Sequence, residues 1–211
     1  MSKKTLGIII PYYKNSEECE IAFKKLMGTL SKQLTDDMIL FVWEDGQYSE
    51  WLQMFKKNNI LVEGCSNINY GVSLARNKGI EYLIDKVEYI LFIDSDDMIA
   101  DDYLKVMCEY CADNTHEVIE STFYVNKEVA QFNPNLVRSG VAGSAIQTKI
   151  IGDIRFKENL QIAEDTTFMN SVIDLSKHRK KHAPTNYYYQ YGINPNSLIM
   201  RYNRRDIRKE R

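Results

Sequence analysis

Residues 89–93 form a wholly apolar run that ends in four polar residues, Asp94, Ser95, Asp96 and Asp97. A short apolar run bounded by polar residues is typical of a strand buried on both faces, as at the centre of a parallel sheet. Ligands of open α/β sheets bind beyond the carboxyl ends of the strands, so these aspartates stand where a ligand is expected. Their mutual repulsion is relieved if a cation or the hydroxyl groups of a ligand lie between them. The alternative is that they open the next helix, because Asp is a favoured residue at helix starts.

The rest of the chain alternates apolar strands with helices that carry one apolar face. This alternation predicts an α/β fold: one domain over residues 1–200, with a mostly parallel, Rossmann-like sheet flanked by helices, a less regular acceptor-side C-terminal third, and a basic tail at 201–211. We expect strands at 6–10, 38–43, 60–62, 89–93, 117–125 and 187–191. We expect helices at 19–30, 48–57, 72–83 and 101–111, and one after residues 163–165 with Phe168, Met169, Val172 and Leu175 facing inward. Residues 132–144 fit neither pattern.

The composition is that of a globular protein, with 44% hydrophobic and 27% charged residues in 211. No apolar run is long enough to cross a bilayer, and the first strand begins too early for a secretory signal, so we expect a cytoplasmic protein. Cys108 and Cys111 lie on the apolar side of a predicted helix and are interpreted as reduced core thiols rather than as metal ligands. The chain has no Gly-x-Gly-x-x-Gly and no Gly-Lys-Ser/Thr motif, which argues against a Rossmann dehydrogenase and a P-loop enzyme.

The formal net charge of -2 hides an uneven distribution of charge. Residues 177–211 carry ten Lys or Arg against two Asp or Glu, a balance of +8, whereas the preceding 176 residues carry -10. A basic end on an acidic body suggests an anionic partner, such as a phosphate-rich acceptor, a membrane surface in peripheral contact, or nucleic acid. The alternative is a solubilising tail over 201–211.

Three acidic clusters follow strands or open a helix: Glu44 with Asp45, the group at 94–97, and Glu164 with Asp165. Sheet topology should gather them at one edge. Oxygen ligands of this kind suit Mg²⁺ or Mn²⁺. Without a phosphate-binding loop, the diphosphate of a nucleotide would have to be neutralised by such a metal and by a basic side chain.

Five segments in this order resemble the family 2 glycosyltransferases with the GT-A fold. They are Ile-Ile-Pro-Tyr-Tyr at 9–13, Glu-Asp-Gly at 44–46, Gly-Val-Ser-Leu-Ala-Arg-Asn-Lys-Gly at 71–79, Phe-Ile-Asp-Ser-Asp-Asp at 92–97 and Glu-Asp-Thr-Thr-Phe at 164–168. The resemblance extends from about residue 6 to about residue 197. It implies a glycosyltransferase of polysaccharide biosynthesis that uses a nucleotide-sugar donor.

The resemblance also implies roles for residues of a donor site. Tyr13 would stack on the base, and Asp45 would accept a hydrogen bond from a ring N–H, which suits the uracil of a UDP-sugar. Arg76 would lie near the diphosphate, and Asp94 would hold the ribose hydroxyls. The full set of implied donor-binding residues is Pro11, Tyr13, Glu44, Asp45, Arg76, Asp94 and Ser95.

The remaining implied roles concern the metal and the acceptor. Asp96 and Asp97 would hold Mn²⁺ or Mg²⁺, with His182, or alternatively His178, as a further ligand. Asp165 would act as the general base on an acceptor hydroxyl, in a single displacement that inverts the anomeric carbon, and Glu164 would orient it. The acceptor would be a saccharide, a lipid-linked molecule or another anionic molecule.

The chain departs from the family pattern at three positions. Glu44 stands where the family has Asp, Gln47 where it has Ser, and Lys14 where it often has Asn. Two other functions compete with glycosyl transfer. A nucleotidyltransferase would use a similar metal site, but residues 11–14 contain no glycine. A nucleic-acid-binding module could use the basic end and the tyrosines at 187–191, although the acidic body would repel a phosphate backbone.

Overall fold

The computed structural model describes residues 2–57, 59–65, 67–125, 128–130, 140–160, 162–174 and 176–189. Several sequence predictions fall outside these ranges: the basic tail at 201–211, most of the unassigned stretch at 132–144, Leu175, and the predicted strand beyond Tyr189.

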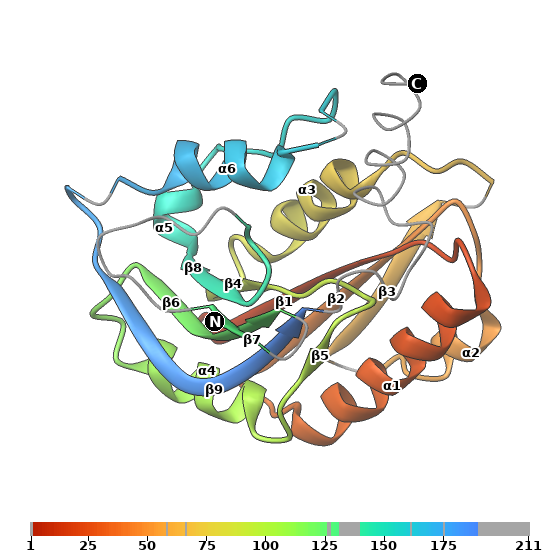
Figure 1. The fold of residues 1–211 in the computed structure, drawn as a ribbon, viewed down its shortest axis with the longest axis horizontal. Coiled ribbons are helices and arrows are strands. Elements are labelled where there is room, and N and C mark those ends of the chain that lie inside the picture. The colour runs from red at the N-terminus through yellow and green to blue at the C-terminus, as the bar shows by residue number, and fades with distance from the viewer. Residues whose placement is uncertain are drawn as a thin grey trace.

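Within the described residues, the strands form a single curled sheet in the order β3-β2-β1-β4-β8-β6-β9-β5, with β7 paired to β6 (Figure 1). Strands β3, β2, β1 and β4 are parallel to one another, and β6 is parallel to β9, whereas β8 runs antiparallel to both β4 and β6. The bounds are β1 Lys4–Tyr12, β2 Met38–Asp45, β3 Ile60–Cys65, β4 Val87–Phe92, β5 Met98–Ile99, β6 Val118–Val125, β7 Glu128–Ala130, β8 Ser144–Gln147 and β9 Lys180–Tyr189.

Helices cover both faces of this sheet (Figure 1). Apolar side chains of α1 (Glu17–Gln33), α2 (Glu50–Gln53) and α4 (Tyr103–Ala112) pack on one face. Those of α3 (Val72–Leu83), α5 (Thr148–Ile151) and α6 (Glu164–Val172) pack on the other. Strand β1 shows the division, because Ile8 and Ile10 belong to the first cluster and Ile9 to the second. The central strands are apolar on both sides because both sides are covered.

Helix α3 lies close against β1, and Gly79 makes this approach possible. A Cβ at this position would lie 2.7 Å from the side chain of Ile9, so a larger residue would push the helix away from the sheet. The close contact matters for function, because α3 carries Arg76. No helix in the described ranges is both long and apolar enough to span a bilayer.

The predicted single α/β domain with a mostly parallel sheet is confirmed, and most differences concern the second half. Strand β9 begins at Lys180 rather than at 187, β8 and α5 lie next to the unassigned stretch, and α2 is shorter than predicted. The first half of β9 is not predicted because its sequence is polar. Its first residue, Lys180, has a buried side chain that pairs with Glu120 of β6 at 2.9 Å. Strand β8 has four residues and α5 has four, too few to show a period.

Candidate active site

The carboxyl ends of β1, β2 and β4 lie at one edge of the sheet because the three strands are parallel. Asp45 is the last residue of β2, Asp94 follows β4, and Glu164 opens α6. The structure therefore brings acidic residues from three distant parts of the chain toward the same edge, as ligand sites of open α/β sheets require.

Arg76 of α3 joins two of these acidic groups directly. Its Nη2 donates to Asp94 Oδ1 at 2.8 Å and its Nη1 to Glu164 Oε1 at 3.0 Å. Burial acts to lower the pKa of Arg76, but Asp94 and Glu164 outweigh burial and raise it, so the guanidinium stays charged. The guanidinium also lies over the ring of Phe156, 5.2 Å from its centroid. Phe156 in turn stacks on Phe168 of α6, with centroids 3.9 Å apart. Arg76 thus fixes α6 relative to the end of β4.

Glu164 and Asp165 begin α6 after Ala163, a non-glycine residue in the left-handed region (φ 61°). The side chain of Glu164 is 12% exposed, and burial raises its pKa, with Arg76 opposing and Asp165 adding to the effect. Asp165 is partly exposed and accepts a hydrogen bond from Thr166 N at 2.7 Å. A Cβ added at Gly140 would lie 3.3 Å from Asp165 Oδ2. The sequence-predicted base therefore lies near the surface, next to a carboxylate that Arg76 holds.

The two acids at the end of β2 face different neighbours. Asp45 accepts hydrogen bonds from Tyr70 N at 2.9 Å and Gly71 N at 2.6 Å, and so holds the loop that leads into α3. Glu44 is buried and accepts a hydrogen bond from Gln53 of α2 at 3.1 Å. Burial raises the pKa of Glu44, while hydrogen bonds from Ser49 and Gln53 oppose this. Of the two acids, Asp45 is thus the one that binds the loop between β3 and α3.

Two exposed tyrosines lie near the ends of these strands, one after β1 and one in the loop before α3. Tyr13, directly after β1, is 43% exposed, and Tyr70 is 53% exposed. Pro11 lies within β1, in register with Trp43 of β2. A flat ligand at the carboxyl ends of β1 and β2 would find exposed rings to stack against.

The residues at 94–97 form a turn in which Asp97 N donates to Asp94 O at 3.2 Å. Asp94, Ser95 and Asp96 are partly exposed, whereas Asp97 is buried. The carboxylate of Asp97 accepts a hydrogen bond from the hydroxyl of Tyr187 at 2.6 Å. Neighbouring acids of one turn therefore have different surroundings.

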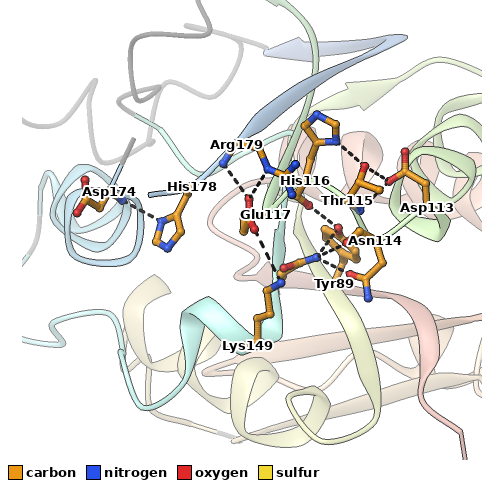
Figure 2. A network of polar contacts seen from close by, with 11 residues as sticks. Tyr89, Asp113, Asn114, Thr115, His116, Glu117, Lys149, Asp174, His178 and Arg179 are labelled. Carbon is orange, nitrogen blue, oxygen red and sulfur yellow. Dashed lines mark hydrogen bonds and ion pairs between the residues drawn. The ribbon is translucent and has the colours of Figure 1, made fainter. Parts of the chain in front are cut away.

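The two histidines considered as metal ligands lie elsewhere on β9 and before it. His182 Nε2 is 3.0 Å from Thr122 Oγ1. His178 Nδ1 accepts a hydrogen bond from Asp174 N at 3.0 Å, in the polar network of Figure 2. In the part of the chain that the structure describes, no three His, Cys, Asp or Glu side chains are grouped to hold a metal. The metal roles of Asp96, Asp97 and His182 stay predictions.

Sequence reasoning missed Tyr187 and Phe156. Tyr187 was expected only as part of a tyrosine-rich strand, and Phe156 lies between predicted elements. No local pattern connects either residue to Asp94 or Arg76, because the contacts cross about ninety and eighty residues of chain. Asn77, next to Arg76, was also missed; it donates to Phe156 O at 3.0 Å and accepts from Phe156 N at 2.8 Å.

A curled, mostly parallel sheet with acidic strand ends at one edge is the arrangement of GT-A transferases, and the family comparison agrees. Residues 8–179 match the family described as Glycosyl transferase family 2, and the chain belongs to this family.

Its relatives include a poly(ribitol-phosphate) glycosyltransferase and a protein named for minor teichoic acid biosynthesis. The chain is 25% identical over 118 residues to the poly(ribitol-phosphate) beta-N-acetylglucosaminyltransferase TarP of Staphylococcus aureus, covering 55% of this chain and 36% of TarP. It is 22% identical over 221 residues to the minor teichoic acid biosynthesis protein GgaA of Bacillus subtilis, covering 92% of this chain and 49% of GgaA. The chain therefore spans half or less of the length of these relatives.

Among solved structures, S. aureus TarS residues 1–349 in complex with UDP-GlcNAc superposes with a TM-score of 0.71 at 20% identity, covering 88% of this chain and 58% of that chain. At this identity the likeness shows the fold: a single α/β domain of the GT-A type.

Proposed function

We propose that this protein transfers a sugar from a UDP-sugar to a hydroxyl group of an anionic, phosphate-containing acceptor, with inversion at the anomeric carbon. The observation that carries the proposal is the link that Arg76 makes between Asp94 and Glu164. Asp94 is proposed to bind the donor, and Glu164 adjoins the proposed base. One side chain thus sets the spacing between the two halves of the reaction. Family membership supplies the class of reaction.

The donor would lie along the carboxyl ends of β2, β1 and β4. In this proposal Tyr13 stacks on the uracil, and Asp45, already fixed by Tyr70 N and Gly71 N, accepts its ring N–H. Asp94 and Ser95 hold the ribose. Arg76 would lie near the diphosphate, and its hydrogen bond keeps Asp94 in place. The UDP-GlcNAc bound to the TarS structure supports a UDP-sugar as the donor.

A divalent metal, Mn²⁺ or Mg²⁺, would be held by Asp96 together with the diphosphate. The residues fit such an ion, because Asp96 and Asp94 are partly exposed carboxylates at the strand end. Three grouped acidic, histidine or cysteine ligands are absent from the described residues, so the diphosphate and water would complete the shell, as Mg²⁺ prefers. When bound, the metal supplies stabilisation of the charge that develops on the departing UDP.

Asp165 would remove the proton from the acceptor hydroxyl as its oxygen attacks the anomeric carbon from the side opposite the diphosphate. The bond between the acceptor oxygen and the anomeric carbon forms as the bond between that carbon and the diphosphate oxygen breaks, so the configuration inverts and UDP leaves. Glu164 would not take the proton, because its carboxylate is bonded to Arg76; it would hold the start of α6 in place. The partial exposure of Asp165 is consistent with an acceptor that approaches from solvent.

The names of the relatives suggest the acceptor class. TarP is named for poly(ribitol-phosphate), and GgaA for minor teichoic acid synthesis. A polyol-phosphate polymer is anionic and rich in hydroxyl groups, in agreement with the basic end of the chain. We therefore propose a polymer of this class as the acceptor and polysaccharide biosynthesis as the process.

The donor site is tested by thermal stability. We expect the melting temperature to rise with UDP and Mn²⁺ together and much less with either alone, because Asp96 and the diphosphate would hold the metal jointly. GDP and ADP with Mn²⁺ serve as controls for the base. No shift with any nucleoside diphosphate and metal would contradict the donor site.

The catalytic roles are tested by three substitutions assayed with UDP-sugars and a polyol-phosphate polymer. Asp165→Asn should keep the thermal shift by UDP and Mn²⁺ and lose transfer by about a hundredfold or more. Asp96→Asn should lose the shift itself. Asp153→Asn, at an exposed acid outside the site, should change neither. Transfer by Asp165→Asn near the parent rate would place the base elsewhere.

A further inference from the structure

We infer that Tyr187 of β9 is a positioning residue for the metal-binding turn at 94–97, and that Asp97 anchors this tyrosine instead of binding the metal. This inference rests on the proposed function for the identity of the turn. Its geometry comes from contacts that the sequence did not predict.

The hydroxyl of Tyr187 contacts both ends of the turn. It donates to Asp97 Oδ2 at 2.6 Å and accepts from Asp94 N at 3.1 Å. The turn has a hydrogen bond of its own, from Asp97 N to Asp94 O at 3.2 Å. Asp96 lies between these fixed points. Because its neighbours on the turn are held by one hydroxyl group, the direction in which Asp96 points is restricted as well.

The ring of Tyr187 is itself tightly held. It is fully buried and stacks on Phe123 of β6, with centroids 5.4 Å apart and planes 6° apart. Behind it lies Gly143 in a positive-φ conformation (φ 73°), where an added Cβ would be 3.0 Å from the ring. Gly143 N also donates to Phe92 O, at the end of β4, at 2.9 Å. The hydroxyl is therefore placed by packing, with little freedom to follow the turn if the turn moved.

Burial separates the roles of the two acids that the sequence treated as a pair of ligands. Asp97 is 1% exposed and bonded to Tyr187, whereas Asp96 is partly exposed. A metal that also binds a diphosphate and water needs a carboxylate that solvent can reach. Asp96 meets this requirement and Asp97 does not.

The test compares Mn²⁺ binding in the presence of UDP, measured by the loss of the free Mn²⁺ signal in electron paramagnetic resonance. Tyr187→Phe keeps the ring and removes the hydroxyl. We expect its Mn²⁺ affinity with UDP to fall about tenfold to a hundredfold, the range known for residues that orient a metal ligand. Tyr89→Phe is the matched control, since Tyr89 is also fully buried and its hydroxyl donates to His116 O and accepts from Gln147 Nε2, near the start of β4 and away from the turn that follows its end. This control should keep the parent affinity even where its melting temperature falls.

Substitutions of the two acids complete the test. Asp97→Asn retains an oxygen that accepts the hydrogen bond from Tyr187, so its Mn²⁺ affinity should stay within about threefold of the parent, whereas Asp96→Asn should lose binding. Parent affinity in Tyr187→Phe, or a loss in Asp97→Asn equal to that in Asp96→Asn, would overturn the inference and leave the proposed function standing. If the parent protein binds no Mn²⁺ with UDP, the proposed function fails and the inference fails with it.

Discussion

Acidic residues at the two ends of the sheet have opposite surroundings. At the end where β6 and β9 begin, Asp113 pairs with Lys181, Asp174 with Lys177, and Glu117 with Arg179 and Lys149. Figure 2 shows Glu117 with its partners Arg179 and Lys149, together with Asp113 and Asp174. At the carboxyl end of β4, Asp94 and Glu164 both bind Arg76.

The pKa values follow this difference. A hydrogen bond from Lys181 lowers the pKa of Asp113, and a hydrogen bond from Ser176 lowers that of Asp174 to about 2. The pKa of Glu117 is also lowered, although burial acts to raise it. A backbone hydrogen bond from Arg179 and the charges of Arg179 and Lys149 outweigh this burial. Burial raises the pKa of both Glu164 and Glu44. Acids with their own counter-charges stabilise the fold, whereas acids that share one leave negative charge for a bound cation to neutralise.

The largest expected effect comes from removing an arginine at each end. Arg76→Met leaves Asp94 and Glu164 without a counter-charge in a site where Arg76 is 4% exposed, so we expect a loss of about 3 to 5 kcal/mol in the free energy of unfolding. Transfer should fall by about a hundredfold, because α6 is no longer held against β4. Arg179→Met, at a side chain 66% exposed, should cost about 1 kcal/mol or less. Urea unfolding and a transfer assay measure both. Equal losses in the two variants would refute the distinction.

A second comparison tests the effect of burial on the strength of an ion pair, at two adjacent positions of one strand. Two consecutive lysines of β9 form ion pairs that differ in burial. In the pair of Lys180 with Glu120, the side chains are 1% and 3% exposed. In the pair of Lys181 with Asp113, they are 33% and 36% exposed. Lys180→Met should cost about 3 kcal/mol in unfolding free energy, because it removes a buried charge that pairs with the buried side chain of Glu120. Lys181→Met should cost about 1 kcal/mol or less. If both variants unfold at the same urea concentration, burial does not determine how much each ion pair contributes to stability.

The smallest effect is a difference in the direction of pH dependence. The folded-state pKa of Glu164 lies above its ordinary value of 4.5, so its contribution to stability is complete below pH 4.5 and is lost as the pH rises through the folded pKa. The pKa of Asp174 falls from 3.8 to about 2, so its contribution is present above pH 3.8 and is lost as the pH falls toward 2.

Melting temperatures of the parent, Glu164→Gln and Asp174→Asn between pH 2 and 7 test this prediction. The difference between the parent and Glu164→Gln should shift in favour of the variant as the pH rises past 4.5. The difference between the parent and Asp174→Asn should shrink below pH 3.8. Parallel curves for the two variants would show that the two ends titrate alike.

The sequence predicted the first half of the fold well, because β1, β2 and β4 are apolar runs whose burial on both faces needs no polar partner. It also placed Asp45, Asp94 and Glu164 toward one edge, since the direction of parallel strands follows from chain order. It could not predict that β9 starts at Lys180, because charged residues are expected in solvent and the sequence does not show that Lys180 forms a buried ion pair with Glu120. It could not separate Asp96 from Asp97 either, because the partner of Asp97 is ninety residues away.

The contact of Arg76 with both Asp94 and Glu164 has a consequence for how such enzymes can diverge. The segment that is proposed to recognise the nucleotide and the segment that is proposed to meet the acceptor are encoded far apart, and they are joined here by two hydrogen bonds from one side chain. A chimera that exchanges residues 163–174 with those of a relative should therefore keep α6 in its place beside the end of β4 if the incoming helix starts with a glutamate facing Arg76. New acceptors could then be acquired without rebuilding the part of the enzyme that reads the donor.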